Sequence, residues 1–228
     1  PHAGYVYSGP AAAHCYLALA EQKKPETVIV IGPNHTGWGT PVSMMGEGSW
    51  ETPLGRVPLD TALAKEILEQ SDAIDYDHTA FLREHSVEVQ VPFLQYIYGE
   101  FKLMPICMGY QDLETSREVG KAIHRAAEGR NVLVVASTDL THQERQESAN
   151  RKDRMVIDAI LEMDEERLQR VVREHRITTC GYGPVSAALV ASKLAGAGEA
   201  ELLSYYTSGD IIGDYSAVVG YAALKITR

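Results

Sequence analysis

Short apolar runs that alternate with helical segments are the feature that most constrains the fold of this chain. The runs at 27–32, 102–108 and 131–137 are rich in aliphatic residues and are bounded by glycine, proline or polar residues. Runs of this length and composition predict strands that are buried on both faces of a sheet. Their alternation with helices predicts an α/β fold with a central, largely parallel or mixed sheet flanked by helices.

Helical spacing of the apolar residues predicts the segments that connect and follow these strands. Ser8 is a candidate cap for the first helix and Asp60 for the second. We expect helices at 10–22, 59–70, 113–128, 148–163, 165–175 and 184–195.

The remaining segments are shorter or mixed in pattern. Residues 41–58 contain short runs interrupted by glycine and proline, which predicts a small hairpin. The stretch 84–98 alternates like a strand and then spaces its apolar residues like a helix, and we favour a helix that begins near Ser86 or Pro92. Two strands, at 201–207 and 215–226, are joined by "SGDIIGD". No repeat, linker or low-complexity segment divides the chain, so we expect one domain over 1–228, with room for a short segment before Pro1.

Charge and cysteine content restrict the function and the compartment. The net charge of −10 argues against a nucleic-acid partner and against an anionic membrane surface, because both require clustered Lys and Arg. No apolar run approaches the roughly 20 residues of a membrane helix. Three irregularly spaced cysteines are not a disulfide framework and fit a reducing compartment, so we expect a cytoplasmic protein.

Titratable side chains stand at the ends of the predicted elements. His35 follows the strand 27–32, and Asp139 and His142 follow the strand 131–137. Sites in open α/β sheets form beyond the carboxyl ends of the strands, so these side chains are expected to meet in one crevice. Other candidates at element ends are His2, Glu84, His85 and Cys180.

Each candidate also has an ordinary structural interpretation. A single histidine at a strand end is more often a hydrogen-bonded surface residue than a ligand. Asp139 is suited to capping a turn, Glu84 to complementing a helix dipole, and Cys180 to packing as a buried thiol. No spacing in the chain matches HExxH or paired CxxC motifs, so no local motif is decisive alone.

Several blocks taken together resemble the Memo family, also called AmmeMemoRadiSam system protein B. They are "PHAGYVYSGPAAAHCY", "VIVIGPNHTG", "REHSVEVQVPFLQ", "ASTDLTH", "TTCGYGP" and "DYSAVVGYAAL". The resemblance implies a fold similar to class III extradiol dioxygenases, which hold non-haem Fe(II), with cysteine in place of the usual carboxylate ligand. The metal ligands implied are His2, His35 and Cys180.

The resemblance also implies roles for the neighbouring residues. Asp139 and His142 match an acid and a histidine that line the pocket, with His142 moving protons and Asp139 fixing its tautomer. Glu84 and His85 are expected to contribute to cofactor binding. Human-type proteins carry further histidines where this chain has Thr36 and Gly183. The residues around the pocket are therefore expected to differ between this chain and the human-type proteins.

Two imidazoles and one thiolate form a borderline-soft donor set that suits Fe(II) or Cu(I), with Zn(II) as a further option, and suits Mg(II) or Ca(II) poorly. We therefore expect a mononuclear metal site with a redox role, as in a dioxygenase-like oxidoreductase. Whether it turns over a substrate, and its oligomeric state, are left open.

Two alternatives remain. The first is an adaptor module that binds peptide or protein in a vestigial pocket, and the second is metal-free nucleophilic chemistry by Cys180 and His142. Expected partners are a small molecule or a peptide, and the family name also suggests a radical-SAM protein of a shared pathway.

Overall fold

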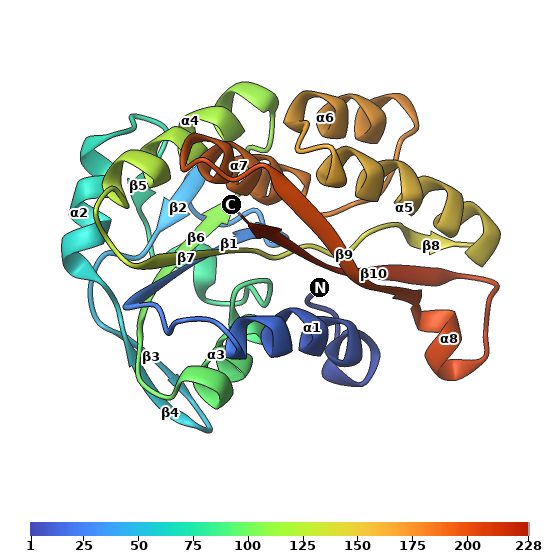
Figure 1. The fold of residues 1–228 in the computed structure, drawn as a ribbon, viewed down its shortest axis with the longest axis horizontal. Helices are drawn as coiled ribbons and strands as arrows, with labels where there is room; N and C mark the ends of the chain where they lie inside the picture. Colours follow the sequence, from blue (N-terminus) through green and yellow to red (C-terminus); the bar gives the residue numbers. More distant parts are fainter. Residues whose placement is uncertain (228) are drawn as a thin grey trace.

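A five-stranded sheet forms the centre of the computed structural model, which describes residues 1–227 (Figure 1). Its strands are β1 (Thr27–Pro33), β2 (Val42–Met44), β5 (Asp75–Tyr76), β6 (Lys102–Met108) and β7 (Val132–Ala136). They lie in the order β5-β2-β6-β1-β7. β1 pairs in parallel with both β6 and β7, whereas β2 is antiparallel to β6, so the sheet is mixed. The predicted α/β class, with its sheet and flanking helices, is confirmed.

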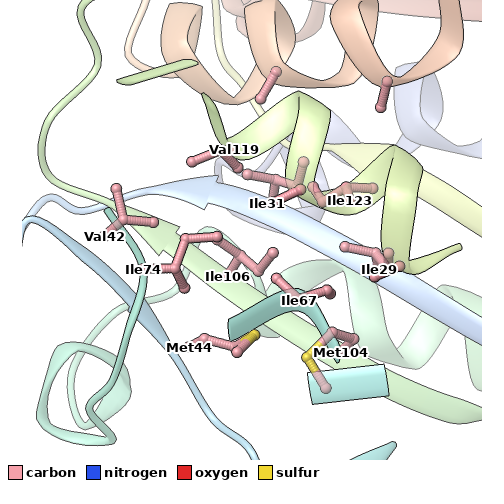
Figure 2. Packing of buried hydrophobic residues seen from close by; sticks show 14 of the residues in the cluster. Ile29, Ile31, Val42, Met44, Ile67, Ile74, Met104, Ile106, Val119 and Ile123 are labelled. Carbon is pink, nitrogen blue, oxygen red and sulfur yellow. The ribbon is translucent and has the colours of Figure 1, made fainter. Parts of the chain in front are cut away.

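β1 is buried at every position and serves both halves of the core. Ile29 and Ile31 point to one face, where they pack against α2 (Thr61–Glu69), α4 (Leu113–Ala126) and α7 (Tyr182–Leu194) (Figure 2). Successive side chains of a strand point to opposite faces, which is why an uninterrupted apolar run can fill two layers.

The other face of the sheet is covered by α1 (Tyr5–Ala20) and α3 (Val91–Tyr98). Val28 and Val30 of β1 pack there among the buried side chains of both helices. In Figure 1 these two helices lie on the opposite side of the sheet from α4 and α7. The main sheet is therefore the middle one of three layers, with helices on both of its faces.

A second, antiparallel sheet lies beside this core, in the order β8-β10-β9. Its strands are β8 (His142–Glu144), β9 (Glu199–Thr207) and β10 (Val218–Thr227), and α8 (Ser208–Ile212) joins the last two. The helices α5 (Gln146–Leu161) and α6 (Glu165–Glu174) pack with α7 and with the side chains of β9 and β10. A two-stranded hairpin, β3 (Ser49–Thr52) with β4 (Gly55–Pro58), completes the fold.

Most predicted elements are present within a few residues of their predicted bounds. β6 matches the predicted strand 102–108, and Asp60 caps α2 by accepting a hydrogen bond from the Leu63 amide. α3 begins at Val91 with Pro92 in its first turn, which confirms the choice of a helix in 84–98. No helix in residues 1–227 is both long and apolar enough to cross a membrane.

The first helix differs from its prediction because it begins at Tyr5 rather than near Pro10, with Gly4 as its cap residue and Ser8 buried inside it. Pro10 interrupts the backbone hydrogen bonds of α1, and a side chain of β9 provides hydrogen bonds in their place. The Tyr206 hydroxyl of β9 accepts from the Ala11 amide at 3.0 Å and donates to the Tyr7 carbonyl at 2.6 Å. These are two groups that would otherwise bond to each other in an α-helix.

Four short elements were not predicted. β2 belongs to the main sheet although it lies in the segment for which a hairpin is expected, and β5 and β8 lie in stretches for which no element is predicted. α8 occupies "SGDIIGD", where Thr207 and Asp210 form a capping box. Segments this short have too few residues to show a hydrophobic period, so their pairing is decided by tertiary contacts.

Candidate metal centre

Three of the predicted side chains meet at the carboxyl ends of β1 and β7. His2 precedes α1, His35 follows β1, and Cys180 immediately precedes the turn into α7. One nitrogen from each histidine and the cysteine sulfur all lie within 4.8 Å of one another. The fold thus assembles this trio from residues that are up to 178 positions apart.

His2 is held in one orientation and one tautomer. Its Nδ1 atom lies 2.8 Å from Ser137 Oγ, which itself donates to the Ser86 carbonyl at 2.6 Å. Because the Ser137 proton is used on Ser86, Nδ1 of His2 must carry the proton and donate it to Ser137. The lone pair of Nε2 then faces Cys180 Sγ at 3.3 Å.

Further contacts fix the surroundings of His2. Its backbone amide donates to Asp139 Oδ1 at 2.8 Å, and Gln90 donates from Nε2 both to Ser137 Oγ and to the Pro1 carbonyl. The ring is almost completely buried, and burial is the main reason that its pKa lies well below the usual value. His2 is therefore neutral at pH 7, which is the form that binds a metal.

His35 is held by a carboxylate. Its Nδ1 lies 2.8 Å from Glu84 Oε1, and its backbone amide donates to Glu84 Oε2. Glu84 also accepts from the amides of His85 and Ser86 at 2.8 and 2.9 Å. Although burial opposes its charge, these hydrogen bonds lower the pKa of Glu84 to about 2, so it is ionised and accepts the Nδ1 proton of His35.

The other ring nitrogen of His35 faces the sulfur. Hydrogen bonds to Cys180 and then to Glu84 raise the pKa of His35 to about 10, so the metal-free ring is protonated at pH 7. A histidine whose Nδ1 is bound to a carboxylate and whose Nε2 points at other donors is the arrangement commonly found at metal ligands.

The Cys180 sulfur is placed by backbone groups. It accepts a hydrogen bond from the Asp139 amide at 3.2 Å, and it lies just outside the amino end of α7. Both features stabilise negative charge on sulfur. The next residue, Gly181, allows this position, because a Cβ atom there would lie 2.5 Å from the Ser137 carbonyl oxygen.

His85 adds a third ring to the cluster. It stacks on His35 with ring centroids 4.9 Å apart, and its centroid lies 5.4 Å from that of His2. Its side chain is 50% exposed, whereas His2 is buried, so the cluster opens to solvent on the His85 side. His35, Glu84 and His85 also form a second group with metal-ligating spacing, which shares His35 with the trio.

The placement of Asp139 and His142 differs from their predicted roles. Asp139 lies at the trio through its bond to the His2 amide, but it does not fix the tautomer of His142. His142 Nδ1 instead lies 2.8 Å from the Thr178 carbonyl, to which it donates. In residues 1–227, no hydrogen bond or ring contact joins His142 to the trio. Asp139 thus bonds to His2 and His142 to Thr178 rather than to each other, and the catalytic roles expected of Asp139 and His142 stay predictions.

Two residues at the centre were not predicted as functional. Ser137 and Gln90 orient His2, and both are buried. Ser137 had a usable signal, because it is a polar residue at the carboxyl end of a buried strand beside Asp139. Gln90 had no such signal in the sequence, since it lies in the stretch 84–98, whose apolar pattern fits both a strand and a helix.

The donors fit a transition-metal ion. Metal–nitrogen bonds of about 2.0 Å and metal–sulfur bonds of about 2.3 Å in a tetrahedral site place the donors about 3.5 Å apart. The separation of 3.3 Å between His2 Nε2 and Cys180 Sγ is close to that value. The tautomer of His2 and the orientation of both rings already match a ligand set, so little rearrangement is required.

The sequence is similar to a large group of proteins along almost its full length. A sequence model of the Memo-like protein family matches residues 1–225. A MEMO1 family protein from Methanopyrus kandleri is 52% identical over 231 residues, covering 100% of this chain and 82% of the relative. A MEMO1 family protein from Methanothermobacter thermautotrophicus is 50% identical and covers 99% of this chain and 82% of the relative.

The fold also has a solved counterpart. The crystal structure of an uncharacterised protein from Escherichia coli K12 superposes with a TM-score of 0.58, covering 90% of each chain. The two sequences are 13% identical, so this similarity concerns the fold alone.

Proposed function

The chain belongs to the Memo-like protein family, and we propose that it is a metalloprotein that holds one Fe(II) or Cu(I) ion on His2, His35 and Cys180. One observation carries the proposal. Both imidazoles have Nδ1 bound to an oxygen acceptor and Nε2 directed at the same sulfur. A histidine in a protein core needs only one hydrogen-bond partner for its ring. Two imidazole rings that both direct Nε2 at one thiol are typical of a set of metal ligands.

The donor set favours a redox-active ion. Two imidazoles and a thiolate bind soft and borderline ions, and Zn(II) competes for the same donors. When bound, Fe(II) or Cu(I) supplies one-electron redox chemistry. The protein contributes a buried wall around His2 and an opening beside His85, through which a small molecule can approach the donors.

We further propose that His85 and Glu84 serve the bound ion and substrate. Glu84 orients His35 and carries the negative charge that offsets a cation in this buried place. His85 lies at the exposed side of the rings, where it can hydrogen-bond an incoming molecule. A proton-transfer role for His142 stays a prediction, as do the radical-SAM partner, a peptide ligand and the cytoplasmic location.

The experiment is anaerobic metal analysis of protein purified with Fe(II) or Cu(I). Wild type should bind close to one ion per chain, and Cys180→Ser and His35→Ala should lose most of it. His14→Ala and Cys15→Ser are matched controls, because His14 is exposed on α1 and Cys15 forms no contact with the trio in residues 1–227. Unchanged binding in both ligand variants would overturn the assignment.

A second candidate, metal-free nucleophilic chemistry, is favoured by the contact between Cys180 and His2 Nε2 at 3.3 Å. In this case His2 or His35 is the base, rather than His142. Alkylation by iodoacetamide separates the two functions. If Cys180 is a metal ligand, the bound ion should protect it from alkylation and a chelator should remove that protection. If Cys180 is a metal-free nucleophile, it should be alkylated equally fast with and without the chelator.

A further inference from the structure

The guanidinium group of Arg83 lies over an aromatic ring and is exposed to solvent. Its Cζ atom is 5.3 Å from the centroid of the Trp38 ring, and Trp38 itself is 45% exposed. Within residues 1–227, Arg83 forms no ion pair or hydrogen bond, although the chain has 31 acidic side chains. Stacking on an aromatic face holds a guanidinium in one plane and leaves the N–H groups of its edge available. Arg83 therefore presents an unused, planar set of donors to solvent.

The segment that carries Arg83 also contributes to the candidate metal centre. The next residue, Glu84, is buried and accepts the hydrogen bond from the ring of His35. Arg83 and His85 flank this buried residue, and both are exposed. Both therefore lie on the solvent side of this short segment, while Glu84 lies on its inner side.

The position of Trp38 is tied to that of His35 by the loop that contains both. Asn34, which precedes His35, donates from Nδ2 to the Trp38 carbonyl at 2.7 Å and accepts from the Gly37 amide at 2.9 Å. The Thr36 hydroxyl accepts from the Trp38 amide at 3.1 Å. These hydrogen bonds close the loop on itself, so the aromatic ring under Arg83 is carried by the same ordered turn as a candidate metal ligand.

Two stacked pairs lie side by side along these two segments. In the first pair the rings of His35 and His85 are 4.9 Å apart between centroids, and in the second Arg83 lies over Trp38. Trp38 is three residues after His35, and Arg83 is two residues before His85. The second pair is thus the neighbour of the first, and the first stands where the histidine cluster opens to solvent. The guanidinium of Arg83 therefore flanks the open side of the candidate metal centre.

We propose that Arg83, held in place by Trp38, binds the carboxylate of the small molecule that reaches the metal ion. The inference rests on the proposed metal site and names the class of its substrate, a carboxylic acid that carries a second, metal-binding group. One planar guanidinium matches one planar carboxylate through two parallel N–H···O bonds. A phosphate monoester carries a charge of about −2 and is balanced less well by a single guanidinium. Because the chain has a net charge of −10, an anion needs such a local positive charge in order to approach the site.

The test uses two pairs of thiols, because a thiol binds soft and borderline metal ions. The pairs are mercaptopropionate with mercaptopropanol and mercaptohexanoate with mercaptohexanol, and calorimetry measures their affinity for anaerobic, Fe(II)-loaded protein. In at least one pair the acid should bind about 10-fold more tightly than the alcohol. Arg83→Gln should remove this preference without changing the affinity for the alcohol, and Arg83→Lys should retain only part of it, since an ammonium group lacks the planar fork. Arg56→Gln, on β4 near Lys102 at the amino end of β6, is the matched control and should keep the preference.

The same titrations separate a failure of this inference from a failure of the metal site. Thiols that bind only to the metal-loaded protein, but with equal affinity for acid and alcohol in both pairs, would overturn the inference and leave the metal site standing. Thiols that bind no better after metal loading would overturn the metal site and this inference with it. A preference that survives in Arg83→Gln would assign the carboxylate to another group, and tighter binding of a mercaptoalkyl phosphonate of the same length would show that the substrate class is wrong.

Discussion

His35 donates a hydrogen bond of 2.8 Å from Nδ1 to Oε1 of Glu84, whose side chain is fully buried. The two residues are 49 positions apart, and Glu84 is anchored by backbone amides on both loops. The ring of His35 therefore has one orientation, with Nε2 toward Cys180. The orientation of one candidate metal ligand therefore depends on this pair.

Replacing Glu84 by glutamine is expected to weaken metal binding. The amide group has one acceptor oxygen, so its NH₂ group must face a backbone N–H that the carboxylate now accepts. We expect metal affinity to fall about 10- to 100-fold and the free energy of unfolding by about 1–3 kcal/mol. Competition titration with a chelator of known affinity measures the metal affinity. Glu88→Gln, at an exposed position, is the control, and equal affinities in the two variants would contradict the prediction.

The stability of the metal-free protein should depend on pH through the same pair. The pKa of Glu84 is lowered from 4.5 to about 2, so its contribution is complete above 4.5 and is lost as the pH falls toward 2. Hydrogen bonds to Cys180 and then to Glu84 raise the pKa of His35 from 6.5 to about 10, so its contribution is complete below 6.5 and is lost as the pH rises through 10.

The stability difference between wild type and Glu84→Gln should therefore be largest between pH 4.5 and 6.5. Urea denaturation of metal-free protein from pH 4 to 10 measures it. A difference that stays constant up to pH 10 would show that the two residues are not coupled in this way.

The sequence predicted the trio of His2, His35 and Cys180 because strand ends and family motifs both pointed to them. The residues that orient the trio were harder to find. Ser137 accepts from His2 only because its own proton goes to Ser86, and this depends on a loop 51 positions away. Local spacing contains no information on such a contact.

The parallel strands were predictable for a simple reason. A buried strand that serves two faces needs an unbroken apolar run, and β1 and β6 both have one. The contacts of His142 were not predictable, because His142 and Glu144 of β8 pair with β10, a strand more than 70 positions later. Pairing over this separation is decided by how the sheets pack, which a short segment does not reveal.

Gly181 should not tolerate a side chain. A Cβ atom there would lie 2.5 Å from the Ser137 carbonyl oxygen and 2.7 Å from Thr138 Cβ, so the backbone must move. Because Cys180 is the preceding residue, Gly181→Ala should displace its sulfur and reduce metal stoichiometry as well as stability, the latter by about 1–3 kcal/mol. Gly198→Ala is the matched control, since its Cβ would meet nothing within 4 Å. Full metal binding by Gly181→Ala would contradict the prediction.

Removing the Tyr206 hydroxyl should destabilise α1 and, through it, His2. Tyr206→Phe leaves the Ala11 amide and the Tyr7 carbonyl without their partner, and Pro10 prevents the helix from restoring a regular turn. We expect the free energy of unfolding to fall by about 1–3 kcal/mol in urea denaturation. Tyr110→Phe, at an exposed position, should change it little. α1 begins three residues after His2. Amides 5–12 should exchange faster in Tyr206→Phe, and unchanged exchange there would mean that the hydroxyl does not hold the helix.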